Sequence, residues 1–191
     1  MQKKGCAVAQ LPDKTVSHLL LPVPSFDPDG IIKGGGHIEN TLKLLPENVT
    51  VIGGNLNASC LSKYQTIDLL GNAYFLAQNA AITAQCALQV AAGYIDTTLS
   101  DTPTLILGWG RIGKCLARLL KSSGCQVTVA ARKASDRALL NALGYSALDF
   151  TDIRNNLYRY RILFNTVPEQ TIESTVLDLW KSGIKLDLAS Y

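Results

Sequence analysis

Apolar and polar positions follow a regular order from residue 104 to the end of the chain. Apolar runs of strand length occur at residues 104–107, 126–130, 145–148, 161–165 and 184–188. Apolar residues at helical spacing occupy the segments between them, at residues 112–122, 135–143, 151–158 and 170–181. Strands that alternate with helices in this way pair in parallel, with a right-handed crossover at each helix. The pattern predicts the α/β class, with a Rossmann-type doubly wound parallel sheet.

The N-terminal half shows a less complete version of the same pattern. Strands are expected at residues 16–21, 49–52 and 66–70, and helices at residues 38–45, 55–62 and 72–94. This order predicts a partial second flavodoxin-like or Rossmann-like α/β domain. We expect this domain to comprise residues 1–98, including the long interdomain helix 72–94, and the Rossmann domain to comprise residues 99–191. His18 lies inside the first apolar run and is predicted to be buried.

Two expected strands end in Val-Pro, at Val23-Pro24 and at Val167-Pro168. This repetition fits two α/β domains that face each other, and it places the first on the substrate side. Candidate substrate contacts there are Pro24, Ser25 and His37. The strand at residues 16–21 lacks the neighbour that the usual strand order gives it, and an uncovered apolar edge promotes aggregation. We therefore expect the chain to be truncated at both ends, or to form a homo-oligomer that completes its sheet.

The stretch Gly108-Trp109-Gly110-Arg111-Ile112-Gly113 joins the strand 104–107 to the helix 112–122. In a strand, glycine turn and helix of this kind, the first glycine permits the tight turn and the second lets the backbone approach a pyrophosphate. The third lets the helix pack closely on the strand. The stretch therefore predicts a dinucleotide-binding turn, and an ordinary glycine-rich turn is the alternative.

The next strand indicates which dinucleotide binds. An NAD-binding domain carries a carboxylate about twenty residues after the turn, for the ribose 2′-hydroxyl. That position falls near Ala131, and Arg132 and Lys133 follow it. Two cations suit a 2′-phosphate, so NADP(H) is favoured over NAD(H), unless both are simply solvated surface charges. The expected cofactor contacts are Gly108, Trp109, Gly110, Arg111, Ile112, Gly113, Arg132, Lys133, Asn165, Thr166, Val167 and Pro168.

Composition restricts the function further. The chain has 191 residues, of which 47% are hydrophobic, and its net charge of +3 comes from scattered side chains. Neither nucleic acid nor a membrane surface is therefore an expected partner. The five cysteines contain no CxxC pair, which favours the reducing cytoplasm and argues against a metal site. The weakly polar run at residues 73–95 contains several amides and predicts a helix within a protein, not a membrane span.

Several motifs occur together in one order. They are Leu20–Pro24 with Asp29-Gly30, Leu107–Lys114, Val127–Arg132, Asn165–Pro168 and Leu186–Ser190. The ordered set resembles the family of the A subunit of dipicolinate synthase, which is related to the NAD-binding domains of D-2-hydroxyacid dehydrogenases. The resemblance implies an NADP-linked oxidation of a dihydropyridine dicarboxylate to dipicolinate in sporulation. It also implies that the partner is a second, flavoprotein-like synthase subunit.

The start of the long helix departs from that family. The family shows Asn-Ala-Ile-Pro-Thr-Ala-Glu-Gly, whereas Asn79 and Thr83 are kept here and Gln85 replaces the glutamate. These three residues are the candidate catalytic residues, although a glutamine cannot exchange a proton at neutral pH. Two alternatives stay open. One is a catalytically silent dinucleotide-binding chain with an interaction or regulatory role, and the other is a different oxidoreductase resembling D-2-hydroxyacid dehydrogenases.

Overall fold

The structure is a computed structural model that describes residues 13–169, 172, 180 and 183–189. The chain divides into two compact units, Met1–Leu76 and Ala77–Tyr191. The sequence placed the boundary after residue 98 instead. The division falls earlier because α2 (Ala73–Ala92) places Ala84, Ala87 and Ala91 in the hydrophobic core of the second unit.

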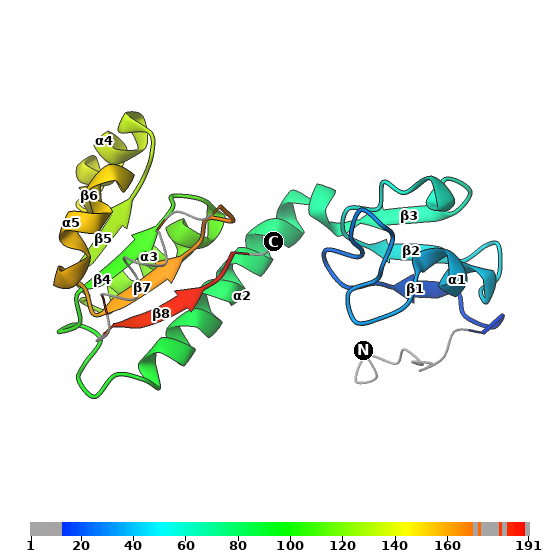
Figure 1. Cartoon of the computed structure of the whole chain (residues 1–191), viewed down its shortest axis with the longest axis horizontal. Helices are drawn as coiled ribbons and strands as arrows, with labels where there is room; N and C mark the ends of the chain where they lie inside the picture. Colours follow the sequence, from blue (N-terminus) through cyan, green and yellow to red (C-terminus); the bar gives the residue numbers. More distant parts are fainter. Residues whose placement is uncertain (1–12, 170–171, 173–179, 181–182, 190–191) are drawn as a thin grey trace. The chain divides into compact units, whose positions relative to one another are not determined.

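The first unit contains a parallel sheet in the order β1-β2-β3 (Figure 1). Its strands are β1 (His18–Leu20), β2 (Thr50–Gly53) and β3 (Gln65–Asp68), and the helix α1 (Ile38–Lys43) lies between the first two in sequence. A core of aliphatic side chains packs between α1 and one face of the sheet. Its buried members are Leu21, Ile38, Leu42, Leu45, Val49, Val51, Leu56 and Leu61.

The prediction of a buried His18 is wrong. His18 is exposed, and its Nδ1 lies 2.9 Å from Ser17 Oγ. Within the described residues β1 pairs only with β2, and Leu20 is 52% exposed. An apolar run predicts burial on both faces of a strand, but the face of β1 that carries His18 and Leu20 is exposed.

The helix expected at residues 55–62 does not form. Asn55 has a φ of +59°, in the left-handed region that a right-handed helix cannot include. The next backbone N–H, that of Leu56, donates to Asp68 Oδ2 at 3.0 Å. Only the short 3₁₀ turn η2 (Ser59–Leu61) is helical. The carboxylate at the end of β3 therefore organises this loop.

The second unit contains a five-stranded parallel sheet in the order β6-β5-β4-β7-β8, and its arrows point the same way in Figure 1. The strands are β4 (Thr104–Leu107), β5 (Val127–Ala130), β6 (Ser146–Leu148), β7 (Ile162–Asn165) and β8 (Ile184–Asp187). Numbered along this unit, the order is 3-2-1-4-5, which is the Rossmann order. The predicted fold class is confirmed.

Both faces of this sheet carry a hydrophobic core, so it is doubly wound. On one face, Ile106 packs with side chains of α2, α3 (Arg111–Ser122) and α4 (Ala134–Ala142). On the other face, Leu105 and Leu107 pack with Ile153, Leu157 and Trp180. All four residues of β4 are buried. Burial on both faces is the usual condition of a central parallel strand.

The helix expected at residues 151–158 is interrupted. Asp149 accepts a hydrogen bond from the Thr151 backbone N–H at 3.0 Å and so caps the 3₁₀ turn η4 (Phe150–Asp152). Only α5 (Ile153–Asn156) is α-helical, and the 3₁₀ turn η5 (Leu157–Arg159) follows it. Most of the helix expected at residues 170–181 lies outside the described residues.

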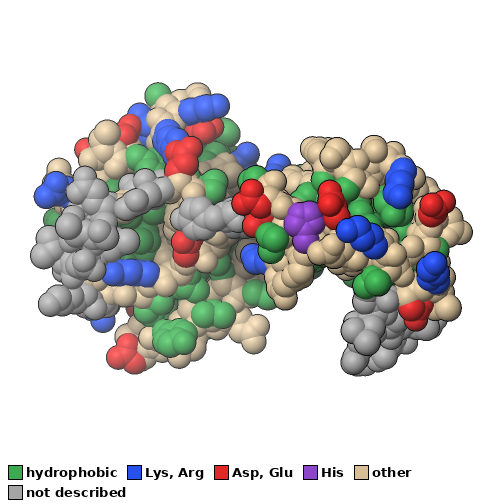
Figure 2. All heavy atoms as spheres, turned by 45° about the vertical axis from the view of Figure 1, so that its right-hand side comes forward, with side chains coloured by type: hydrophobic (Ala, Val, Ile, Leu, Met, Phe, Trp, Pro, Cys, Tyr) green, Lys and Arg blue, Asp and Glu red, His purple; other side chains and the backbone are tan. Residues whose placement is uncertain are grey.

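Among the described residues, no helix combines the length and hydrophobicity needed to cross a membrane. On the face drawn in Figure 2, basic and acidic side chains are interspersed over both units.

Asp68 determines the local stability of the first unit. Burial raises the pKa of this carboxyl, but the backbone N–H groups of Leu56 and Leu70, which donate to it at 3.0 and 2.8 Å, help to hold the pKa below its ordinary value. We expect Asp68→Ala to destabilise the unit by about 1–2 kcal/mol at pH 7, as the loss of a capping side chain does. Hydrogen exchange of the Leu56 and Leu70 amides measures this.

The sign of the pH dependence follows from the lowered pKa of Asp68. The stabilisation is complete above the unfolded pKa of about 3.9 and is lost as the pH falls through the lower folded pKa. The difference between wild type and Asp68→Ala should therefore be constant above about pH 5 and shrink below about pH 4. Asp29→Ala removes the same charge from an exposed turn and serves as the control. Equal protection of both amides in Asp68→Ala and wild type would contradict the prediction.

Candidate functional site

The turn after β4 begins with a glycine in a conformation that other residues rarely adopt. Gly108 has a φ of +99°. A Cβ at this position would lie 2.7 Å from Thr166 Oγ1 and 2.8 Å from Val167 Cγ2. Both the backbone conformation and the close contact with the segment after β7 therefore require a glycine here.

The other two glycines of the turn differ in what surrounds them. A Cβ at Gly113 would lie 2.2 Å from the carbonyl oxygen of Gly108, so α3 approaches the turn more closely than a side chain allows. At Gly110, a Cβ would have no neighbour within 4 Å, and the φ of −78° is ordinary. Gly110 therefore borders open space beside the backbone. The three glycines have the geometry that a dinucleotide turn needs.

The first turn of α3 is suited to bind an anion. Gly110 is its N-cap and has no side chain to cap the free N–H groups. No acidic residue lies in this first turn, and Arg111 is exposed there. The backbone donors and the positive end of the helix dipole are therefore available to a phosphate group.

The side chain of Trp109 points away from this open space. It packs against the core, with its ring 5.8 Å from the ring of Tyr145 and Lys114 Nζ 5.7 Å from the indole centroid. Its Nε1 is buried and has no hydrogen-bond partner among the described residues. Ile112 also packs against this core. At Trp109 and Ile112, the side chains pack against the core, so the backbone groups are the atoms available to contact a cofactor.

The segment after β7 closes one side of the glycine turn. Thr166 Oγ1 donates to the carbonyl oxygen of Leu107 at 2.7 Å. Asn165 Nδ2 donates to the Val167 carbonyl oxygen at 3.1 Å and to Asp187 Oδ1 at 3.0 Å, while Asn165 Oδ1 accepts from the Val167 N–H at 3.1 Å. Asn165 and Thr166 therefore hold the ends of β4, β7 and β8 together. Val167 packs against the second core, and Pro168 is exposed.

Arg132 lies just after β5, as the sequence indicates, and its side chain has two partners. The guanidinium forms an ion pair with Glu169, and its carbon lies 5.7 Å from the ring centroid of Phe150. The Arg132 and Glu169 side chains are 54% and 69% exposed. The sequence analysis did not include Glu169, because the two residues are far apart in sequence and only the strand order brings them together.

Arg137 fixes the loop that carries Arg132. Its Nη1 donates to the carbonyl oxygens of Ala131 at 2.8 Å and Arg132 at 2.7 Å, and its Nη2 lies 2.8 Å from Asp149 Oδ2. Hydrogen bonds from the backbone and side chain of Thr151, together with Arg137, hold the pKa of Asp149 below its ordinary value. The sequence analysis missed Arg137 too. Arg137 lies in the first turn of α4, a few residues after the end of β5, and this position could have marked it in the sequence as a contact of the loop.

The three candidate catalytic residues on α2 do not share one face. Asn79 and Gln85 are exposed, and Thr83 is half-buried. Residues two positions apart in a helix point about 200° apart, so Thr83 and Gln85 lie on nearly opposite sides. Counting residues around the helix would have shown this from the sequence.

The candidate substrate residues of the first unit have structural contacts. Ser25 is fully buried, and its hydroxyl donates to the Pro22 carbonyl oxygen and accepts from the Gly54 N–H, each at 2.9 Å. Pro24 is half-buried after a cis peptide bond. His37 is the N-cap of α1, and its Nδ1 accepts from the Glu39 N–H at 3.2 Å. Ser25 is thus inaccessible to a substrate.

Across the described residues, no group of three His, Cys, Asp or Glu side chains could hold a metal ion. The four described cysteines, Cys60, Cys86, Cys115 and Cys125, are unpaired. Burial raises the pKa of the Cys60 and Cys125 thiols. Raised pKa values keep these two thiols protonated, so they are poor nucleophiles.

Comparison with known proteins gives the following results. No family model matches the chain. The chain is 22% identical to the A subunit of dipicolinate synthase from Bacillus subtilis over an alignment 201 positions long, which covers 97% of this chain and 66% of that protein. The chain is a relative of the dipicolinate synthase A subunit. The resemblance stated from the sequence is confirmed.

Solved structures agree with this relationship. The crystal structure of the dipicolinate synthase A subunit from Bacillus halodurans has a TM-score of 0.77 at 23% identity, covering 95% of this chain and 66% of that one. A transhydrogenase from Sinorhizobium meliloti has a TM-score of 0.68 at 16% identity, covering 98% of this chain and 63% of that one. The chain therefore has the α/β fold of these proteins, and it spans 66% of the length of the curated Bacillus subtilis relative.

Two glycine substitutions in this relative of the dipicolinate synthase A subunit should differ sharply in stability. Gly113→Ala places a Cβ 2.2 Å from a backbone carbonyl oxygen, whereas Gly110→Ala places one in open space. We expect Gly113→Ala to lower the free energy of unfolding by about 2–3 kcal/mol, in the range of overpacked core substitutions. We expect Gly110→Ala to lower it by about 1 kcal/mol or less, because alanine is a poorer N-cap residue than glycine but meets no neighbouring atom. Urea unfolding followed by circular dichroism compares the two variants, and similar stabilities would refute the assigned roles.

Proposed function

We propose that the second unit binds NADP(H) and that the chain acts as a dipicolinate synthase A-type oxidoreductase subunit. The observation that carries this proposal is the open space at Gly110, beside the uncapped first turn of α3. A pyrophosphate that approaches this backbone receives hydrogen bonds from the free N–H groups of the helix. The likeness to a transhydrogenase supports a nicotinamide dinucleotide as the ligand.

The preference for NADP(H) rests on charge at the end of β5. Arg132 and Lys133 are exposed and follow the strand that, in this fold, lies beside the adenosine ribose. A guanidinium and an ammonium group at this place favour a 2′-phosphate over a 2′-hydroxyl. Arg137 donates to the backbone carbonyl oxygens of Ala131 and Arg132. In this proposal it therefore positions Arg132 and does not itself contact the nucleotide.

The reaction we propose is the oxidation of a dihydropyridine dicarboxylate to dipicolinate. The substrate ring loses a hydride and a proton, NADP⁺ becomes NADPH, and aromatisation of the ring provides the driving force. This chain binds the cofactor at the glycine turn. Asn165 and Thr166 hold the ends of β4 and β7 together, and thereby fix the surface on which the nicotinamide ribose rests.

In our proposal, this chain forms a complete catalyst only together with a partner subunit. The relative is named as one subunit of a synthase, which supports a partner subunit, and we propose that this partner is flavoprotein-like and that the two act in sporulation. We also propose a cytoplasmic location, which the unpaired cysteines support.

A second candidate function is a catalytically silent chain that keeps the dinucleotide site for interaction or regulation. The arrangement of α2 favours it, because Thr83 and Gln85 lie on nearly opposite sides of the helix. Gln85 also cannot act as a general acid or base at neutral pH, because its amide does not ionise there. The third alternative is another oxidoreductase resembling D-2-hydroxyacid dehydrogenases, with a different small acid as its substrate.

Nucleotide titration tests the proposed cofactor. We expect the chain to bind NADPH more tightly than NADH by about tenfold, which corresponds to about 1.4 kcal/mol. Arg132→Glu should remove this preference, while Gly110→Asp should abolish binding of both nucleotides because its carboxylate fills the open space. Calorimetry measures all three proteins. Equal or weaker binding of NADPH by the wild type would eliminate the NADP(H) proposal.

A reconstitution experiment separates the active and silent candidates. The chain is combined with the partner subunit, a dihydropyridine dicarboxylate and NADP⁺, and dipicolinate is followed by its ultraviolet absorbance. If the chain is active, the wild type forms product. If it is silent because of Gln85, only Gln85→Glu, with the segments that the relatives carry beyond the aligned region, forms product. Product from the unmodified chain would exclude the silent candidate.

A further inference from the structure

We propose that Glu169 is a specificity-determining residue of the dinucleotide site, and that it supplies, from the segment after β7, the carboxylate missing at the end of β5. This inference rests on the proposed function. It concerns the choice between the two cofactors and not whether a dinucleotide binds. The observation that carries it is the ion pair between Arg132 and Glu169.

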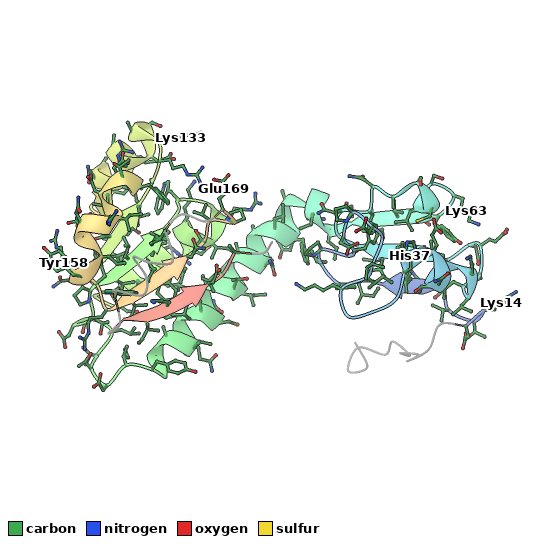
Figure 3. The ribbon with its side chains drawn as sticks, viewed as in Figure 1. Lys14, His37, Lys63, Lys133, Tyr158 and Glu169 are labelled. Carbon is green, nitrogen blue, oxygen red and sulfur yellow. The ribbon has the colours of Figure 1, made fainter. Side chains whose placement is uncertain are left out.

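The strand order places this ion pair across the glycine turn. β5 and β7 are the two neighbours of β4, and β4 leads directly into Gly108. Arg132 follows the carboxyl end of β5 and Glu169 follows the carboxyl end of β7, so their side chains meet across the end of β4. Lys133 and Glu169 both lie on the upper side of the second unit in Figure 3. This is the edge of the sheet at which Rossmann domains bind the pyrophosphate and the adenosine ribose.

Two of the nearby cations are already paired with carboxylates. Arg137 is paired with Asp149 and is bound to two backbone carbonyl oxygens, so it is committed to the loop. Arg132 is paired with Glu169. Among the described residues, Lys133 after β5 and Arg111 at the start of α3 form no ion pair. Arg132, the side chain best shaped for a phosphate, is thus held by a competing anion.

This competition acts oppositely on the two cofactors. A 2′-phosphate takes the guanidinium from Glu169 and then lies close to an unpaired carboxylate of the same sign, which weakens binding. A 2′-hydroxyl carries no charge and can donate a hydrogen bond to the Glu169 carboxylate while Arg132 stays paired. Glu169 therefore favours the unphosphorylated ribose, and Arg132 with Lys133 favours the phosphorylated one.

The ion pair is weak enough to exchange. Both side chains are more than half exposed, and exposed ion pairs contribute about 0.2–1 kcal/mol. A phosphate with a bidentate guanidinium contact exceeds this. Glu169 therefore adjusts the preference for NADP(H) without preventing it, and its removal should be measurable as a change of ratio.

The test is the substitution Glu169→Gln, which keeps the size of the side chain and removes its charge. We expect NADPH binding to tighten about fivefold and NADH binding to weaken about twofold, which raises the ratio of the two affinities about tenfold. Adenosine 2′,5′-bisphosphate and adenosine 5′-monophosphate, which differ by the 2′-phosphate alone, should show the same change. The matched control is Glu47→Gln, an exposed carboxylate of the first unit.

A double-mutant cycle shows whether Glu169 acts through Arg132. In an Arg132→Gln background, Glu169→Gln should tighten NADPH binding by twofold or less, because no guanidinium remains to be released. A ratio of affinities that moves by no more than in Glu47→Gln overturns the inference, and so does a fivefold gain that persists without Arg132. If the wild type binds neither nucleotide, the proposed function itself fails. If it binds both and Glu169→Gln changes nothing, the inference alone fails.

Discussion

The contact between Gly113 and the carbonyl oxygen of Gly108 determines how closely α3 approaches the end of β4. Even one methyl group at Gly113 would lie within 2.2 Å of that oxygen. The short distance brings the free N–H groups of the helix beside the open space at Gly110. Gly108 directly follows β4, which is buried along its whole length and pairs with a strand on each side. The position of the turn is therefore fixed by the centre of the sheet. The anion-binding geometry of the second unit thus depends on the most buried part of its core.

The strands on either side of β4 add what the turn alone lacks. From β7, Thr166 donates to the carbonyl oxygen of Leu107 and closes the turn on one side. From β5, the loop bearing Arg132 is fixed by Arg137 through two hydrogen bonds. The contact of Thr166 joins segments that are adjacent because β7 pairs with β4, whereas the contacts of Arg137 are local in sequence. Strand order therefore determines which side chains can act together at this site.

The features that the sequence predicted well are those decided within a few residues. The glycine turn, the alternation of strands and helices and the position of Arg132 all depend on local spacing, and the structure has them in place. The failures involve longer range or a single backbone angle. Asn55 adopts a left-handed conformation because Asp68 binds the next N–H group, and the exposure of His18 depends on which face of β1 is covered. The Arg132–Glu169 pair spans a sequence separation of 37 residues, and no local pattern indicates it.

The choice between NAD and NADP is usually inferred from a single residue at the end of the second strand of a Rossmann domain, which is β5 here. In this chain that position has no carboxylate, yet a carboxylate reaches the same place from the strand on the other side of β4. At the proposed site, a 2′-phosphate would therefore meet two cations and one anion, not two cations alone. Because the anion is itself bound to the better of the two cations, our proposal has it lower the affinity for the phosphate in two ways, by occupying the guanidinium and by repelling the phosphate. Cofactor preference in such a site is a property of the charges gathered from both neighbours of the central strand, and strand order must be known before these charges can be counted.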